Sequence, residues 1–259
     1  MPSSPFSVVL FDLGSTLIYF DAVWSEMFPR ANADLINALH AAGIMVKADA
    51  FASAFNQGLD NYRQERDNEF IEHSTLYVLR KLLEEHGYPN VPEEILRNPL
   101  KAMYAVSQAA WRIEDDTHAT LRALRQQGYR LGLISNAADD ADIQTLVDNH
   151  GLRPYFEIIL SSAAVGWRKP HPRIFALALE HFGVKPQQAV MVGDTLGADI
   201  LGANNLGMGS VWITRRADVA ANHAHEDTIQ PDAVIHTLSE LPGLLAHWDA
   251  RPTPDLSAL

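Results

Sequence analysis

The sequence predicts an α/β fold: a doubly wound parallel sheet with a separate all-helical domain inserted after its first strand. Two observations predict the sheet. Nearly continuous apolar runs are typical of strands buried on both faces, and from about residue 117 these runs alternate with helical patterns, which is typical of parallel βαβ units. A third observation predicts the insertion, because a long, mostly helical stretch separates the first apolar run from the second.

The predicted strands are short and rich in Val, Ile, Leu or Phe. In chain order they are residues 6–11 (FSVVLF), 129–134 (YRLGLI), 156–160 (FEIIL), 189–192 (AVMV), 210–213 and, as the weakest, 233–235. The helices predicted between the later strands are residues 117–127, 140–150, 172–182 and 199–206. Parallel strands need crossover connections of about this length, so these helices fit between successive strands of one sheet.

The insertion after the first strand is predicted to be helical throughout. Its helical segments are residues 23–42, 48–66, 69–85 and 92–112, with glycine and proline residues between them. Residues 15–21 and 113–116 are the predicted linkers. The predicted domains are a sheet domain at residues 1–20 and 114–248, a helical domain at residues 21–113, and a C-terminal tail at residues 249–259.

Charge and composition exclude several function classes. The chain has 259 residues, 32 of them acidic and 20 basic, for a net charge of −12, and it has no cysteine. The acidic surplus argues against nucleic-acid and anionic-membrane partners, because phosphate groups attract Lys and Arg. The lack of cysteine excludes disulfides, thiolate zinc sites and cysteine nucleophiles. With neither a signal-peptide pattern nor about 18 consecutive apolar residues, we expect a cytoplasmic protein; whether it forms a homodimer stays open.

Polar residues follow the predicted strands at the points where ligands bind in open parallel sheets, the carboxyl ends. In strand order these residues are Asp12, Ser135, Asn136, Lys169, Asp194 and Asp199. Each one alone is also an ordinary turn or helix-cap residue. Their occurrence at successive strand ends favours a functional site over a series of unrelated turns.

These residue types together indicate phosphoryl-transfer chemistry. Crowded carboxylates repel each other unless a cation lies among them, and Mg²⁺ prefers oxygen ligands, so we predict a Mg²⁺ site with Asp12 and Asp194 as the natural pair of ligands. Such an ion neutralises phosphoryl charge, and a carboxylate can attack phosphorus to form an aspartyl phosphate. The Ser135 hydroxyl and the Asn136 backbone N–H can donate to a phosphoryl oxygen, and Lys169 supplies a positive charge.

The ordered motifs resemble those of the haloacid dehalogenase-like hydrolases, in the subclass with a helical cap inserted after the first motif. The first motif, D-x-D-x-[TV], corresponds to residues 12–16 (DLGST), and the second, an apolar strand ending in Ser or Thr, to residues 131–135. The third, Lys before Pro, corresponds to residues 169–170, and the fourth, G-D-x-x-x-x-D, to residues 193–199. The resemblance implies that residues 21–113 are the cap domain.

The resemblance also implies residue roles. It implies that Asp12 is the nucleophile, that Mg²⁺ binds Asp12, Asp194 and the backbone carbonyl of Gly14, and that Asp199 supports the waters of the ion. The catalytic residues expected on this basis are Asp12, Lys169 and Ser135. The substrate-binding residues expected are Ser135, Asn136, Thr16 and Lys169. The implied activity is hydrolysis of a small phosphorylated metabolite.

Gly14 departs from the family pattern. In the family's phosphatases the second aspartate of the first motif protonates the leaving oxygen and then deprotonates the attacking water. Glycine keeps the backbone carbonyl but transfers no proton, and general acid–base catalysis is worth roughly 10²–10⁴ in rate, about 3–5 kcal/mol of barrier. The sequence therefore predicts a slow phosphatase, one with a borrowed proton donor, or one for substrates with good leaving groups. Glycine also eases a turn after Asp12.

Two other functions stay open. Family dehalogenases also lack this aspartate, because halide leaves without a proton, but they need no metal, and the paired aspartates of residues 194–199 favour a metal site. A protein that binds phosphate without hydrolysing it is the second alternative. The helical domain is expected to choose the substrate, and its candidate residues are Trp24, Arg30, Tyr62, Arg63, Arg66, His73 and Trp111. His223 and His225 lie in a polar stretch that is more typical of a solvated loop than of a metal site.

Overall fold

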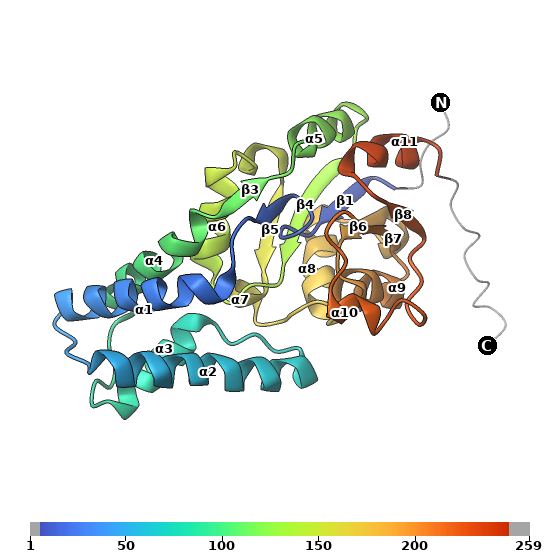
Figure 1. The fold of residues 1–259 in the computed structure, drawn as a ribbon. Coiled ribbons are helices and arrows are strands. Elements are labelled where there is room, and N and C mark those ends of the chain that lie inside the picture. Colours follow the sequence, from blue (N-terminus) through green and yellow to red (C-terminus); the bar gives the residue numbers. More distant parts are fainter. Residues whose placement is uncertain (1–5, 249–259) are drawn as a thin grey trace.

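Within residues 6–248, which the computed structural model describes except for the side chains of residues 64–68, six parallel strands form one open sheet (Figure 1). The strand order is β5-β4-β1-β6-β7-β8. The strands are β1 (Val8–Phe11), β4 (Arg130–Ser135), β5 (Ile158–Ser161), β6 (Ala189–Gly193), β7 (Gly209–Ile213) and β8 (Ala233–Ile235). The predicted α/β class with a doubly wound parallel sheet is confirmed. The predicted tail at residues 249–259 lies outside the described residues.

Helices cover both faces of this sheet, and β1 contributes to both cores. Val9 and Phe11 pack in the core that includes α5, α6 and α11, whereas Val8 and Leu10 pack in the core that includes α8 and α9. These strand residues are fully buried, which is why the strand is continuously apolar and not alternating. The helices of the two cores are α5 (Thr117–Gln126), α6 (Asp140–Asn149), α8 (Pro172–Phe182), α9 (Leu201–Leu206) and α11 (Leu241–Ala246).

Shorter helical elements complete the connections of the sheet. They are η1 (Arg153–Tyr155), α7 (Ser162–Val165), η2 (Pro186–Gln188), η3 (Leu196–Ile200), α10 (Ala220–His223) and η4 (Leu238–Glu240). The helix predicted at residues 199–206 therefore begins with a separate π-helical turn, η3, before α9. In the part of the chain that the structure describes, every helix falls short of the combined length and apolarity that crossing a membrane requires.

Helices α1 to α4, here called the helical unit, lie together beside the sheet (Figure 1). They are α1 (Trp24–Ala41), α2 (Ala48–Glu69), α3 (Thr75–Glu85) and α4 (Glu93–Gln108). The unit has its own hydrophobic core, in which Leu39, Phe51, Phe55 and Leu79 are fully buried. Each helix contributes one apolar face to this core, as expected for amphipathic helices. The helix predicted at residues 69–85 begins only at Thr75, because α2 continues to Glu69 and residues 70–74 between the two helices are not helical.

An antiparallel two-stranded ribbon connects the helical unit to the sheet, and the sequence did not reveal it. β2 (Ile18–Phe20) pairs with β3 (Trp111–Ile113). The predicted linker at residues 15–21 therefore contains a strand, and the helix predicted at residues 92–112 ends at Gln108. A strand of three residues has no periodicity of its own, and its partner lies far along the chain, so a local pattern could not indicate the pairing.

The ribbon is fastened to the sheet side of the molecule by two arginines that follow β7. The guanidinium carbon of Arg216 lies 3.6 Å from the ring centroid of Tyr19 in β2, and Arg216 also pairs with Glu114. Arg215 pairs with Glu114 at 2.8 Å and with Asp116 at 2.9 Å. Both chain crossings between the sheet and the helical unit are thus held in one place.

Candidate active site

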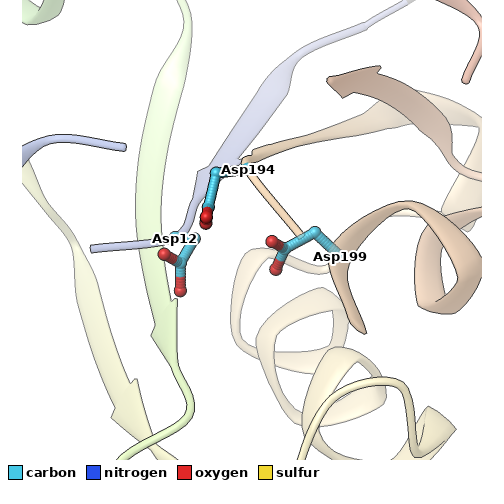
Figure 2. Close-up of side chains that lie close together, drawn as sticks. All are labelled: Asp12, Asp194 and Asp199. Carbon is cyan, nitrogen blue, oxygen red and sulfur yellow. The ribbon is translucent and has the colours of Figure 1, made fainter. Parts of the chain in front are cut away.

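Three carboxylates converge at the carboxyl edge of the sheet (Figure 2). Asp12 directly follows β1, Asp194 directly follows β6, and Asp199 lies in the turn η3. β1 and β6 are neighbours in the sheet, so their ends bring Asp12 and Asp194 together. One oxygen from each of the three side chains lies within 4.8 Å of the others, and all three residues are buried. The sequence-based expectation that these residues meet is confirmed.

Lys169 lies among these carboxylates. Its Nζ is 2.6 Å from Oδ1 of Asp12 and 2.7 Å from Oδ1 of Asp199, and it donates a hydrogen bond to the Ile134 carbonyl at 2.7 Å. Asn136 holds the backbone of this lysine, because its Nδ2 donates to the Lys169 carbonyl (2.9 Å) and its Oδ1 accepts from the Lys169 N–H (2.8 Å). The Asn136 side chain is therefore a support for Lys169, a function that the sequence did not indicate.

The charges of this cluster do not balance, since three carboxylates surround one ammonium group. Burial raises the pKa of Asp12 to about 6, although Lys169 opposes this rise. Burial also raises the pKa of Asp194 well above its usual range, and the charges of Asp12 and Asp199 add to the effect. Burial disfavours the charged form of Lys169, but the two carboxylates outweigh it and the pKa of Lys169 is raised. A buried, all-oxygen cluster with surplus negative charge has the chemistry that a hard divalent cation requires.

Gly193 allows the fourth motif to fold so tightly. A Cβ atom at this position would lie 2.3 Å from Cγ of Asp199, a distance that no neighbour could accommodate without moving. The Asp199 side chain therefore packs directly on the glycine backbone, and its Oδ2 accepts a hydrogen bond from the Thr195 N–H at 3.0 Å. The close packing of the Asp199 carboxylate therefore requires glycine at position 193, six residues earlier.

Asn222 fastens the loop that carries Asp194. Its Nδ2 donates to the carbonyls of Asp194 and Ala217, both at 2.8 Å, and its Oδ1 accepts from the Leu196 N–H at 2.8 Å. The side chain is fully buried. The indole N–H of Trp212 donates to the same Asp194 carbonyl at 2.8 Å. The sequence missed Asn222 because a single asparagine in a polar stretch carries no pattern.

A cavity of about 800 Å³ lies between the carboxylate cluster and the helical unit. Asp12, Ser135, Lys169 and Asp194 line it from the sheet side. The lining from the helical unit is mainly apolar, with Trp24, Met27, Phe28, Leu59 and Met103 among its residues, but it also includes the polar side chains of Asn32, Asn56, Arg63, Thr75 and Ser107. The site that the strand ends form thus opens into a space whose other walls combine aromatic and aliphatic side chains with polar ones.

The substrate-selecting candidates differ in their position relative to this cavity. Those that line it are Trp24, Tyr62, Arg63 and Trp111. Arg30 instead lies 3.9 Å from Asp34, and His73 stacks on Tyr77 with ring centroids 4.7 Å apart. Among the described residues, neither Arg30 nor His73 belongs to the lining. The side chain of Arg66 lies outside the described residues.

A second group of contacts ties the helical unit to the loop before Lys169. Residues 70–72 form an antiparallel bridge with residues 166–168. The carboxylate of Glu72, which is fully buried, pairs with Arg168 and accepts a hydrogen bond from Ser162 Oγ at 2.6 Å. The sequence gave no sign of this buried ion pair, because a lone glutamate is usually solvated.

The sequence profile of the haloacid dehalogenase-like hydrolases matches residues 6–207. The chain belongs to this family. A glyceraldehyde 3-phosphate phosphatase of Pyrococcus furiosus is 31% identical over 238 residues, 92% of this chain and 91% of that protein.

Solved structures from the same family superpose on nearly the whole chain. A HAD phosphatase from Thermococcus onnurineus has a TM-score of 0.63 at 28% identity and covers 93% of this chain and 98% of its own. A 2-haloacid dehalogenase from Pseudomonas syringae pv. tomato DC3000 has a TM-score of 0.64 at 28% identity and covers 94% of this chain and 100% of its own. Proteins named for either chemistry thus share this architecture.

The first motif of this haloacid dehalogenase-like hydrolase has an aromatic neighbour at its unusual position. A Cβ atom built on Gly14 would lie 3.4 Å from Cη2 and 3.6 Å from Cζ3 of Trp111. The backbone of Gly14 is outside the left-handed region, and the residue that adopts it is Ser15, with φ 58°. The turn therefore does not require glycine at position 14; what occupies the space beside it is the Trp111 indole.

Two further residues of the first two motifs were expected to bind substrate. Ser135, at the end of β4, is buried and lines the cavity. Thr16 is fully buried, and its hydroxyl oxygen has no hydrogen-bond partner among the described residues. Thr16 is thus enclosed in the loop that follows Asp12, whereas Ser135 borders the space where a ligand would lie.

Proposed function

We propose that the protein is a Mg²⁺-dependent phosphatase that hydrolyses a small phosphorylated metabolite through an aspartyl phosphate on Asp12. The observation that carries the proposal is the buried cluster in which Lys169 contacts Asp12 and Asp199 while Asp194 lies beside them. The similarity to a protein named glyceraldehyde 3-phosphate phosphatase supports the same reaction type.

The donor set fits Mg²⁺, since it is buried, consists of oxygen atoms and carries surplus negative charge. Asp12, Asp194 and the Gly14 carbonyl would hold the ion, with Asp199 supporting its waters. When bound, the ion supplies positive charge that favours the phosphoryl group close to Asp12.

The side chains of this chain account for the individual steps. Lys169 holds one oxygen of Asp12 at 2.6 Å, which orients the carboxylate and favours its charged form. An Asp12 oxygen attacks phosphorus, and the bond from phosphorus to the leaving oxygen breaks with its electron pair on that oxygen. Water then attacks phosphorus, the bond to Asp12 breaks, and inorganic phosphate leaves. Ser135 Oγ and the Asn136 N–H donate hydrogen bonds to a phosphoryl oxygen throughout.

The helical unit is proposed to be the cap of this enzyme. We assign residues 21–113 to the cap and residues 1–20 and 114–248 to the catalytic domain, because helices α1 to α4 have a separate hydrophobic core and face the cavity. Their closure over the cavity would exclude water from the aspartyl phosphate until the leaving group has departed.

The test compares the wild-type protein with Asp12→Asn. With Mg²⁺ and 4-nitrophenyl phosphate, wild type should release nitrophenol and gain one phosphoryl group in intact-protein mass spectrometry after acid quench. Asp12→Asn should do neither, and a chelator should stop the wild-type reaction. Turnover by Asp12→Asn at the wild-type rate would refute the assignment of the nucleophile.

Two observations favour a second candidate, a metal-independent dehalogenase. Position 14 lacks the general acid, which a halide leaving group does not need, and the fold matches a 2-haloacid dehalogenase at 28% identity. Chloride release from 2-chloropropionate in the presence of chelator would establish this activity. Its absence, together with Mg²⁺-dependent phosphate release, would exclude it.

A further inference from the structure

We propose that the substrate is a phosphate monoester of an aromatic alcohol, whose ring binds the aromatic wall of the cavity and whose phenolate leaves without a proton from the protein. This inference rests on the proposed phosphatase function and names its substrate class.

The aromatic wall consists of Trp24, Phe28 and Trp111, which line the cavity, and Phe20 packs against Trp24 and Trp111. The rings of Phe20 and Trp24 stack with centroids 3.9 Å apart, and Trp111 meets them edge-on at 5.4 Å and 6.4 Å. Trp24 is 47% exposed and Phe28 is 39% exposed, although both are large apolar side chains, and both line the cavity. Exposed aromatic surface inside a concave site is typical of a site that binds an apolar ligand group.

Trp111 joins this wall to the reacting end of the site. Its six-membered ring lies 3.4 Å from the position of a Cβ atom on Gly14, two residues after the nucleophile Asp12. A group bonded to the phosphorus attacked by Asp12 would therefore have an indole nearby, and no carboxylate from position 14. The same residue thus extends the apolar wall and occupies the space beside the position where a proton donor is missing.

The cationic side chains of the cavity are already engaged by carboxylates of this chain. Arg168 pairs with Glu72, and Arg63 lies 2.8 Å from Asp60. Asp142, a further acidic residue, also lines the cavity. A second anionic group on the substrate would have to compete with the buried Glu72 for Arg168, whereas an uncharged ring would not; the exposed Arg63–Asp60 pair is a weaker obstacle.

The leaving-group chemistry agrees with an aromatic alcohol. A phenol has a pKa of about 10, far below the value of about 15.7 for water, so a phenolate can depart as an anion where an alkoxide cannot. Asp12 attacks phosphorus, the bond to the phenolic oxygen breaks with its electron pair on that oxygen, and the phenolate takes its proton from solvent. Water then releases phosphate from Asp12, so the net reaction consumes one water and yields phenol and phosphate.

The experiment compares three substrates on the full-length protein with Mg²⁺: phenyl phosphate, benzyl phosphate and glycerol 1-phosphate. Phenyl and benzyl phosphate carry the same ring but differ in the acidity of the leaving oxygen. We expect kcat/KM for phenyl phosphate to exceed that for benzyl phosphate by about 100-fold or more, the lower end of what a general acid supplies. A ratio of the two kcat/KM values below about threefold would overturn the inference, because the rate would then not depend on whether the leaving oxygen needs a proton.

The ring-binding part is tested with Trp24→Ala, and Phe28→Ala replaces it if that variant does not fold. Either substitution should raise KM for phenyl phosphate about tenfold, the effect of losing about 1.4 kcal/mol of apolar contact. Tyr77→Ala is the matched control, because Tyr77 is a cap aromatic that is 48% exposed but does not line the cavity. An equal rise of KM in Tyr77→Ala would overturn the assignment of the aromatic wall.

Among the titratable side chains that line the cavity, Asp142 and His225 are tested as replacements for the missing acid. If Asp142→Asn or His225→Gln slows benzyl phosphate about tenfold or more, within the range of acid catalysis, and spares phenyl phosphate, the protein supplies the proton and the inference is overturned. Failure of the proposed function looks different: no substrate, glycerol 1-phosphate included, would then give phosphate or a phosphorylated Asp12.

Discussion

Replacing Gly14 with aspartate should not restore a general acid unless Trp111 is also reduced. The Cβ atom fits, because its nearest contact is 3.4 Å from Cη2 of the indole and the backbone at position 14 is outside the left-handed region. The carboxylate oxygens, however, would extend about 2 Å further with ordinary bond lengths, into the space that the indole fills. We therefore expect Gly14→Asp alone to raise kcat for benzyl phosphate less than about tenfold, well below full general-acid catalysis.

The double variant Gly14→Asp/Trp111→Leu makes room for the carboxylate. Its kcat for benzyl phosphate should rise about 10²-fold or more above that of Trp111→Leu alone, within the range of general acid–base catalysis. The rate for phenyl phosphate should change much less, because phenolate needs no proton. Trimming Trp111 removes packed apolar surface and should lower the free energy of unfolding by about 2 kcal/mol, so all four proteins are checked by thermal melting.

The assay is steady-state release of phosphate by wild type, both single variants and the double variant, arranged as a double-mutant cycle. A full gain of 10²-fold or more in Gly14→Asp alone would show that the indole does not block the position, counter to the reasoning above. No gain in a folded double variant would show that position 14 does not face the leaving oxygen.

Three other predictions concern residues around the site. Asn222→Ala should lower the free energy of unfolding by about 2–4 kcal/mol, because it removes three buried hydrogen bonds; urea denaturation measures this, and a loss below about 0.5 kcal/mol, within surface-substitution scatter, would contradict it. Burial raises the pKa of Asp142 to about 7. The contribution of protonated Asp142 to the free energy of unfolding is therefore fully present below its unfolded pKa and is lost as the pH rises through about 7. Asp142→Asn, which still accepts a hydrogen bond from Gln108, should flatten the decline in melting temperature between about pH 4 and 7; an unchanged slope would refute it. Glu72→Gln leaves the partly buried Arg168 without its anion and should cost about 3 kcal/mol of unfolding free energy, whereas Glu226→Gln on the exposed surface should cost almost nothing.

The parts of the fold that follow from short-range pattern were predictable. β1 and β6 are buried on both faces, so their residues are apolar without interruption, and a parallel sheet then necessarily gathers Asp12 and Asp194 at one edge. The β2–β3 ribbon was not predictable, because its partners are separated by the whole helical unit and each strand is too short to show a period. Pattern reveals which residues an element buries, but not which distant element it meets.

The site divides in the same way. The charged residues at the strand ends can be predicted from their positions after apolar runs, but the residues that hold them in place by hydrogen bonds cannot. Asn136 was expected to offer its backbone to phosphate, and its side chain proves to hold Lys169. Asn222 and the pair of Glu72 and Arg168 involve polar residues of unremarkable local sequence, whose burial depends on tertiary contacts alone. Likewise, the sequence marked Gly14 as unusual but gave no reason to place Trp111 over it.

The β2–β3 ribbon has a consequence for how the two parts of the molecule can separate. Because both crossings lie in this ribbon and are held by Arg215 and Arg216, any movement of the helical unit relative to the sheet would have one pivot and not two independent ones. Such a movement would also require the bridge between residues 70–72 and 166–168 to break. The rate at which this bridge breaks would then limit product release, separately from the rate at which the bond to phosphorus is broken.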